Sequence, residues 1–90
     1  MTATIVLPAV LAARAGGART LHATGGTLRE VLADAAQAQP AVVDVIQGHG
    51  ELSRFVNVYV DAVDVRVTGG LDTPVTDGAE ITVIPAVAGG

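Results

Sequence analysis

The sequence predicts an α+β domain in which a mixed β-sheet packs on one main helix. Three observations predict this class: two strand-like segments come first, one amphipathic helix follows, and further strand-like segments fill the second half. A chain of 90 residues fits a single domain. Half of these residues are apolar, and Phe55 and Tyr59 are its only Phe, Tyr or Trp, so we expect an aliphatic core.

The first two predicted strands form a hairpin. Thr4–Val10 is rich in β-branched and aliphatic side chains. Ala15-Gly16-Gly17 marks a turn, and Arg19–Ala23 then alternates weakly between apolar and polar side chains. Two strands joined by a glycine-rich turn are most simply paired with each other.

The main helix has the clearest local signal. Gly25-Gly26 ends the preceding strand, and Thr27 and Glu30 have the spacing of a capping box. In that motif the Thr27 hydroxyl accepts from the Glu30 amide, and the Glu30 carboxylate reaches back. Pro40 ends the helix. The apolar face has the i, i+3, i+4, i+7 spacing and consists of Leu28, Val31, Leu32 and Ala35.

The next segments lead to the clearest strand. Ala41–Ile46 is apolar but short, and we interpret it as a turn or a short helix, followed by a loop at Gln47–Gly50. Phe55–Val60 is a strand because its side chains alternate. We assign the valine face of this strand to the core: Val56, Val58 and Val60. The opposite face carries Phe55, Asn57 and Tyr59.

The remaining segments end in a final strand. We expect a turn at Asp61–Asp64, a short strand at Val65–Val67, an irregular crossing through Gly69-Gly70 and Thr73-Pro74, and a tight turn at Asp77-Gly78. Glu80–Pro85 is the last strand, with Ile81 and Val83 alternating against Thr82 and Ile84. This order of elements is that of the β-grasp, or ubiquitin-like, fold. We therefore divide the chain into a β-grasp domain, residues 1–85, and a flexible reactive tail, residues 86–90, which ends in Gly-Gly.

The charge of the chain excludes some partners. The formal net charge is −4, and the basic residues are five scattered arginines, with no lysine. We expect neither nucleic-acid nor membrane binding, because no basic stripe exists and an acidic surface is repelled by anionic lipids. The apolar run Ile5–Ala13 mimics part of a signal peptide, but no basic residue precedes it and Pro8 interrupts it. We therefore expect a cytoplasmic protein.

No catalytic or metal site is predicted. The lack of cysteine excludes a thiol nucleophile and a Cys-ligated metal. His22 and His49 stand far apart in the sequence, and no zinc-protease, dithiol or serine-hydrolase motif occurs. The carboxylates are most simply solvated surface charges. We expect a protein that is not an enzyme and binds no cofactor.

The last two residues carry the chemical hypothesis. Gly89 and Gly90 lack Cβ atoms, so an extended tail can enter a narrow channel and place its carboxylate in another protein's active site. Attack of that carboxylate on the α-phosphate of ATP gives an acyl-adenylate, which a sulfur nucleophile opens to a thiocarboxylate. The alternative is a frayed end without a role. A final strand that runs directly into the tail favours the chemical hypothesis.

These features together resemble the ThiS/MoaD superfamily of ubiquitin-like sulfur carriers. The resemblance covers essentially the whole chain and is most specific in the second half. Within the superfamily the chain most resembles the carriers of cysteine biosynthesis, through its Arg-Phe-Val-Asn run and its Pro-Ala-Val-Ala-Gly-Gly ending. The matching stretches are Arg54–Val60, Asp64–Arg66, Gly69–Leu71, Asp77-Gly78, Ile81–Pro85 and the tail residues Ala86, Val87, Ala88, Gly89 and Gly90.

The resemblance implies a set of partner enzymes. An enzyme of the ubiquitin-activating type would use ATP to adenylate Gly90, and a sulfur source would convert it to the thiocarboxylate. A PLP-dependent cysteine synthase would supply an aminoacrylate made from O-phosphoserine. The thiocarboxylate attacks it, and an S-to-N acyl shift leaves cysteine amide-linked to Gly90. A zinc metalloprotease then releases the cysteine. The cofactors belong to these partners.

A docking site for the partners is expected on the strand face opposite the core. Phe55, Asn57 and Tyr59 share that face, and Ile84 joins them. Arg54 and Arg66 are expected to make contacts at the rim. The alternative is that the two faces are inverted and these residues belong to the core.

Three other functions stay open. The small subunit of molybdopterin synthase would use the same thiocarboxylate chemistry in another pathway. A ubiquitin-like protein modifier would be joined to lysines of other proteins through Gly90. An inert β-grasp interaction module would have a tail without chemistry.

Overall fold

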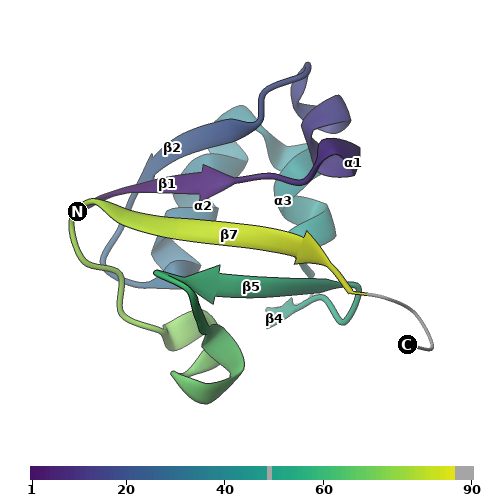
Figure 1. The fold of residues 1–90 in the computed structure, drawn as a ribbon. Coiled ribbons are helices and arrows are strands. Elements are labelled where there is room, and N and C mark those ends of the chain that lie inside the picture. The colour runs from purple at the N-terminus through teal and green to yellow at the C-terminus, as the bar shows by residue number, and fades with distance from the viewer. Residues whose placement is uncertain (49, 87–90) are drawn as a thin grey trace.

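The sheet forms one layer of the molecule (Figure 1). The structure is a computed structural model and describes residues 1–48 and 50–86. Within these ranges a five-stranded sheet has the order β2-β1-β7-β5-β6. The strands β1 and β7 are parallel neighbours and the other pairs are antiparallel, which confirms the predicted mixed sheet. The bounds are Thr2–Val6 for β1, Thr20–Thr24 for β2, Val56–Val60 for β5, Val63–Asp64 for β6 and Ala79–Pro85 for β7.

The helices α2 and α3 form the second layer and cover one face of the sheet (Figure 1). Helix α2 (Leu28–Ala38) is the predicted main helix, and the four residues of its predicted apolar face are all buried. Pro40 ends α2 and begins α3 (Pro40–Ile46), so the short apolar segment is a helix. No helix in the part of the chain that the structure describes is long and apolar enough to cross a membrane.

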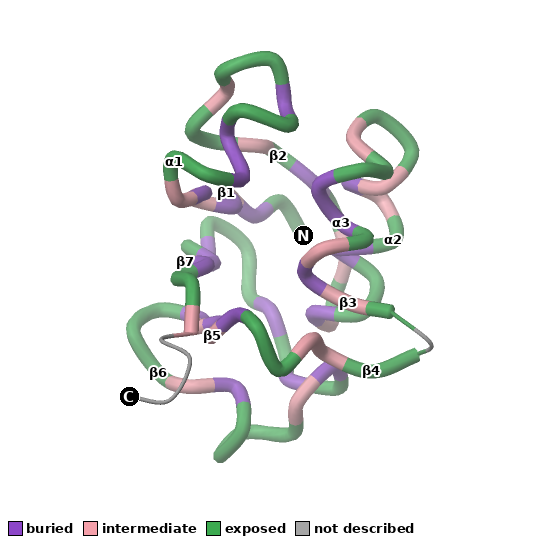
Figure 2. The backbone as a smooth tube through the Cα atoms, turned by 90° about the vertical axis from the view of Figure 1, so that its right-hand side faces the viewer, coloured by how far each residue is buried: buried purple, intermediate pink, exposed green. Residues whose placement is uncertain are grey.

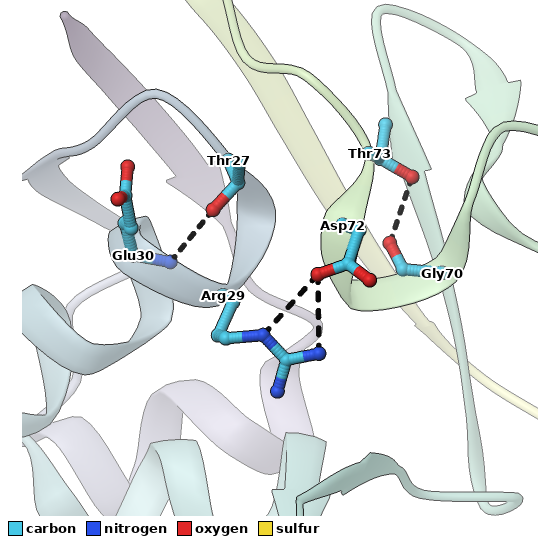
Figure 3. Close-up of polar contacts among 6 residues, drawn as sticks. All are labelled: Thr27, Arg29, Glu30, Gly70, Asp72 and Thr73. Carbon is cyan, nitrogen blue, oxygen red and sulfur yellow. Dashed lines mark hydrogen bonds and ion pairs between the residues drawn. The ribbon is translucent and has the colours of Figure 1, made fainter.

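The start of α2 confirms the predicted Thr27 cap (Figure 3), while the Glu30 carboxylate reaches back one residue further than in the standard capping box. The Glu30 amide donates to Thr27 Oγ1 over 3.2 Å, and the Glu30 carboxylate accepts from the Gly26 amide over 2.8 Å. Gly25 is required just before this turn, because a Cβ atom there would lie 2.6 Å from the Val31 nitrogen. The end of β2 therefore packs closely against the first turn of α2.

A buried threonine ties the second half of the chain to this helix (Figure 3). The Thr73 hydroxyl donates to the Gly70 carbonyl over 2.7 Å, and the Thr73 carbonyl accepts from the Leu28 amide over 3.0 Å. Arg29 and Asp72 add an ion pair at 3.2 Å, but both side chains are largely exposed, so the pair contributes little stability. The irregular crossing predicted here contains the 3₁₀ turn η3 (Gly70–Asp72).

Four predicted segments are wrong in part. The expected turn at Asp61–Asp64 is limited to its first two residues, because Val63–Asp64 forms β6 and pairs with the end of β5. The first strand ends at Val6, because Pro8 starts a helical turn: its carbonyl accepts from the Leu11 and Ala12 amides, and α1 (Ala9–Ala12) and η1 (Ala13–Ala15) follow. The expected strand at Val65–Val67 is the 3₁₀ turn η2, which Asp64 caps by accepting from the Arg66 amide over 2.9 Å. The expected loop at 47–50 contains β3 (Gln47–Gly48), which pairs with β4 (Glu51–Leu52).

The core lies between the sheet and the helices. Figure 2 shows buried residues along the central strands and along α2 and α3, with exposed residues at many of the connections. Val56, Val58 and Val60 are buried together with Ile81 and Val83 of β7. The assignment of the valine face to the core is therefore confirmed.

Candidate docking surface and C-terminal tail

The sheet face opposite the helices carries the predicted docking residues. We call Phe55, Asn57, Tyr59 and Ile84 the docking surface. Phe55 is 71% exposed and Ile84 is 45% exposed, while Asn57 and Tyr59 are half-buried. The alternative with inverted faces is wrong, because a core residue would not expose most of its surface.

The strand register brings three of these residues together. Asn57 lies opposite Ile84, and Tyr59 lies opposite Thr82, in the antiparallel β5–β7 pair. Directly opposite residues in such a pair place their side chains on the same face. Beside this cluster, Tyr59, Ala62, Thr82 and Ile84 line a shallow pocket of about 250 Å³. Ala62 and Thr82 were not predicted from the sequence to belong to the site.

Arg66 is held within the surface rather than left free at its rim. Its Nη1 donates to Asn57 Oδ1 over 2.6 Å, and its Nη2 donates to the Val56 carbonyl over 3.3 Å. The Asp64 carboxylate lies 3.9 Å from the same guanidinium. Arg66 therefore orients Asn57, and it also hydrogen-bonds to a backbone carbonyl at the edge of β5 that faces away from β7.

Arg54 lies in a different setting. It lines a groove of about 450 Å³ together with Phe55 and with Val45 and Leu52. Among the described residues, Arg54 shares none of the hydrogen-bond or ion-pair partners of Arg66. The predicted pair of rim arginines is thus divided between two parts of the surface.

The root of the tail is hydrogen-bonded to the docking surface. Strand β7 ends at Pro85, and the Ala86 amide then donates to the Phe55 carbonyl over 2.9 Å. In an antiparallel pair, hydrogen-bonded and non-hydrogen-bonded residue pairs alternate. Because Phe55 and Ala86 form a hydrogen-bonded pair, the next pair, Val56 and Pro85, is a non-hydrogen-bonded one. The proline therefore ends the strand without costing a ladder hydrogen bond.

The apolar part of the face lies at the end of the sheet where this root begins. Phe55 is paired with Ala86, and Ile84 and Tyr59 follow in the next rows. Farther from the tail the same face is polar: Glu80 pairs with Thr4, whose hydroxyl lies 3.3 Å from His22 Nδ1. A partner that covers the apolar end would therefore sit beside the root of the tail.

The residues predicted to be reactive cannot be placed in this geometry. The predicted tail residues Val87, Ala88, Gly89 and Gly90, and also His49, lie outside the described residues. Among the residues that are described, no group of three or more His, Asp or Glu side chains is placed to hold a metal ion.

The fold and this surface define a class: a ubiquitin-like domain with an exposed, partly apolar sheet face where its C-terminal tail begins. The chain belongs to the ThiS family, whose family model matches residues 5–90. Sulfur carrier protein CysO from Mycobacterium tuberculosis is 39% identical over 93 residues, and the match covers 100% of both chains.

Solved structures confirm the β-grasp fold. A chain of the BexX/CysO complex from Amycolatopsis orientalis matches with a TM-score of 0.90 and 38% identity, covering 98% of this chain and 99% of that one. The small archaeal modifier protein 1 from Methanosarcina acetivorans matches with a TM-score of 0.83 and 28% identity, covering 99% of this chain and 96% of the other.

Proposed function

We propose that this chain is a sulfur carrier protein that delivers sulfur for cysteine biosynthesis from its C-terminus. The observation that carries the proposal is the 39% identity to the sulfur carrier protein CysO over the full length of both chains. The match of the ThiS family model reaches residue 90 and so includes the Gly-Gly ending. The chain acts as a protein cosubstrate, and its partners perform the catalysis.

The proposed chemistry takes place on Gly90. Its carboxylate attacks the α-phosphate of ATP in an activating enzyme, and pyrophosphate leaves. A sulfur nucleophile then attacks the acyl carbon of the adenylate, and AMP leaves. The product is a C-terminal thiocarboxylate, in which sulfur has replaced one carboxylate oxygen. The chain needs no catalytic side chain for either step, which agrees with a sequence that lacks cysteine.

The delivery step uses the thiocarboxylate as a nucleophile. Its sulfur adds to an aminoacrylate held by a PLP-dependent cysteine synthase, which forms a carbon–sulfur bond. The amino group of the resulting cysteine then attacks the thioester carbonyl, and this S-to-N acyl shift leaves cysteine amide-linked to Gly90. Hydrolysis of this amide by a metalloprotease releases cysteine and restores the Gly90 carboxylate.

The folded domain positions the tail in this proposal. Residues 1–85 form the domain that partners hold, and residues 86–90 form the reactive tail. The hydrogen bond from the Ala86 amide to the Phe55 carbonyl supports this division, because it ties the root of the tail to the docking surface. A partner that binds the docking surface thereby also sets where the tail starts.

Intact-mass spectrometry tests the proposal directly. The purified chain, incubated with its activating enzyme, ATP and a sulfide source, should gain the mass expected for one oxygen replaced by sulfur. A variant that lacks Gly90 should gain nothing. Adding a PLP-dependent cysteine synthase and O-phosphoserine should then produce the cysteine adduct. Sulfur transfer to a molybdopterin precursor without such an adduct would favour the molybdopterin pathway instead.

A second candidate is a ubiquitin-like protein modifier. The 28% identity to small archaeal modifier protein 1 over nearly the whole of both chains favours this alternative. The chain has no lysine, so it would modify lysines of other proteins without forming lysine-linked chains of itself. Peptide mapping of cell extracts would separate the two functions, because a modifier leaves its C-terminus amide-linked to lysine side chains.

A further inference from the structure

Strand β2 forms an open edge of the sheet (Figure 1). It pairs only with β1, and the Leu7 amide donates to the Arg19 carbonyl where this pair begins. Because bonded and non-bonded pairs alternate from there, the backbone N–H and C=O groups of Thr20, His22 and Thr24 point away from β1. A row of such groups at an edge is a template for one more strand.

The Asp34 carboxylate of α2 closes one end of this edge. The Thr24 amide donates to Asp34 Oδ2 over 2.9 Å, and the Thr24 hydroxyl donates to the same oxygen over 3.4 Å. The carboxylate therefore takes the place of a neighbouring strand at Thr24. A strand that pairs with Thr20 and His22 would end beside this carboxylate.

A groove of about 400 Å³ lies beside the same edge, between β2 and the C-terminal half of α2. Its apolar lining comes from Leu21, Ala35 and Ala38, and Asp34 is the only Asp, Glu, Lys or Arg that lines it. An added strand would place alternate side chains on this side of the sheet. The groove is therefore positioned to receive every second side chain of such a strand.

The charge of this edge favours a cationic partner. Neither ion pair among the described residues involves Asp34, so its carboxylate has no cation of its own chain as a partner there. Both of its hydrogen bonds fall on Oδ2, which leaves Oδ1 for an outside donor. A second copy of the chain would bring a net charge of −4 against the same charge. A Lys or Arg side chain of another protein would instead attract the carboxylate.

We infer that the β2 edge binds an extended, cationic segment of a partner protein. The segment adds one strand to the sheet, places apolar side chains in the groove and pairs a Lys or Arg with Asp34. Strands β1 and β2 lie on the other side of β7 from β5, so a partner bound here leaves the docking surface uncovered. It can hold the domain while another protein acts on the C-terminus.

Titration with a synthetic peptide, followed by nuclear magnetic resonance, tests the inference. The probe is the end-capped peptide Arg-Ser-Val-Ser-Val-Ser-Arg, whose arginines and valines share one face when it is extended. It should shift the amide signals of Thr20 and His22 most. The same peptide with glutamates in place of arginines should bind about tenfold more weakly, because an attraction becomes a repulsion. Shifts centred on another surface, or equal affinities of the two peptides, would overturn the inference.

Two pairs of variants separate backbone pairing from charge. His22→Pro removes an outward amide without costing a hydrogen bond to β1, so it should abolish peptide binding, whereas His22→Ala keeps the amide and should bind nearly as the original chain does. Asp34→Asn keeps an acceptor for the Thr24 amide but removes the charge, and it should weaken binding about fivefold. Asp44→Asn, on the exposed side of α3, makes the same change of charge and should have no effect.

The results that refute the inference are specific. A folded His22→Pro variant that binds like the original chain would refute strand addition, and unchanged binding by Asp34→Asn would refute the role of Asp34. A dimer in sedimentation analysis that His22→Pro converts to a monomer would assign the edge to a second copy instead. No activating enzyme takes part in these measurements, so their failure would leave the proposed function untouched, and a chain that forms no thiocarboxylate would leave the inference standing.

Discussion

Truncation of the two isoleucines of β7 should affect different properties: folding stability for Ile81 and partner binding for Ile84. Ile81 is 0% exposed, so Ile81→Ala removes a fully packed side chain and should cost about 2–5 kcal/mol. This loss is a large share of the total stability of about 5–13 kcal/mol expected for a domain of this length. Since each kcal/mol shifts the melting temperature by about 4–8 °C, the melting temperature should fall by at least about 8 °C. Ile84 is 45% exposed and is only half packed, so Ile84→Ala should cost about 1 kcal/mol.

The effect on partner binding should have the reverse order, larger for Ile84→Ala than for Ile81→Ala. If a partner covers the exposed half of the Ile84 side chain, the Ile84→Ala substitution should raise the KM for the carrier in thiocarboxylate formation about fivefold to tenfold. Ile81→Ala should leave KM unchanged at a temperature where the variant is folded. Urea and thermal unfolding give the stabilities, and initial rates against carrier concentration give KM.

Val67→Ala serves as the control, because Val67 is 78% exposed and belongs neither to the docking surface nor to its pocket. It should change neither quantity. The reasoning fails if Ile84→Ala destabilises the fold as much as Ile81→Ala does, or if it leaves KM at the original value.

Three further substitutions test other parts of the structure. Gly25→Ala should destabilise the chain by about 1–3 kcal/mol in urea unfolding, because the new Cβ atom would lie 2.6 Å from the Val31 nitrogen; a stable variant would show that β2 can move away from α2. Thr27→Ala should lose about 1 kcal/mol through the missing cap, whereas Thr27→Ser should keep most of it; equal losses would contradict a capping role. Phe55→Asp should leave the melting temperature nearly unchanged and weaken partner binding in titration calorimetry, since Phe55 is 71% exposed; unfolding would place it in the core.

Local sequence patterns were sufficient to predict the helix and strand in which apolar side chains recur with a regular period. The capping residues Thr27 and Glu30 fixed where α2 begins, and the alternation from Val56 to Val60 fixed which face of β5 is buried. Both patterns depend only on side-chain period and neighbouring backbone groups. The same alternation grouped Phe55, Asn57 and Tyr59 on one face, and the structure decided between the two possible orientations by burying the valines.

Other features depend on contacts that no local pattern encodes. The Val65–Val67 segment has strand-like side chains, but capping by Asp64 makes it a 3₁₀ turn. The bond between Arg66 and Asn57 joins residues nine positions apart and arises only when η2 folds back beside β5. Ala62 gave no signal, because alanine is not a residue from which a left-handed turn is predicted.

The arrangement of the sheet explains why a carrier with a glycine ending needs this fold. Glycines offer almost no side-chain surface, so a Gly-Gly tail can supply little of the energy that binds a partner. That energy must come from the domain, and the apolar side chains that supply it should lie where the tail begins. Strand β7 meets both needs: it packs Ile81 and Val83 into the core, presents Ile84 on the docking surface, and leads into Ala86, whose amide is fixed to β5. Under the proposed function, several partners would recognise this surface and act in turn on the same C-terminus, because recognition would use the domain and reaction would use the end of the chain.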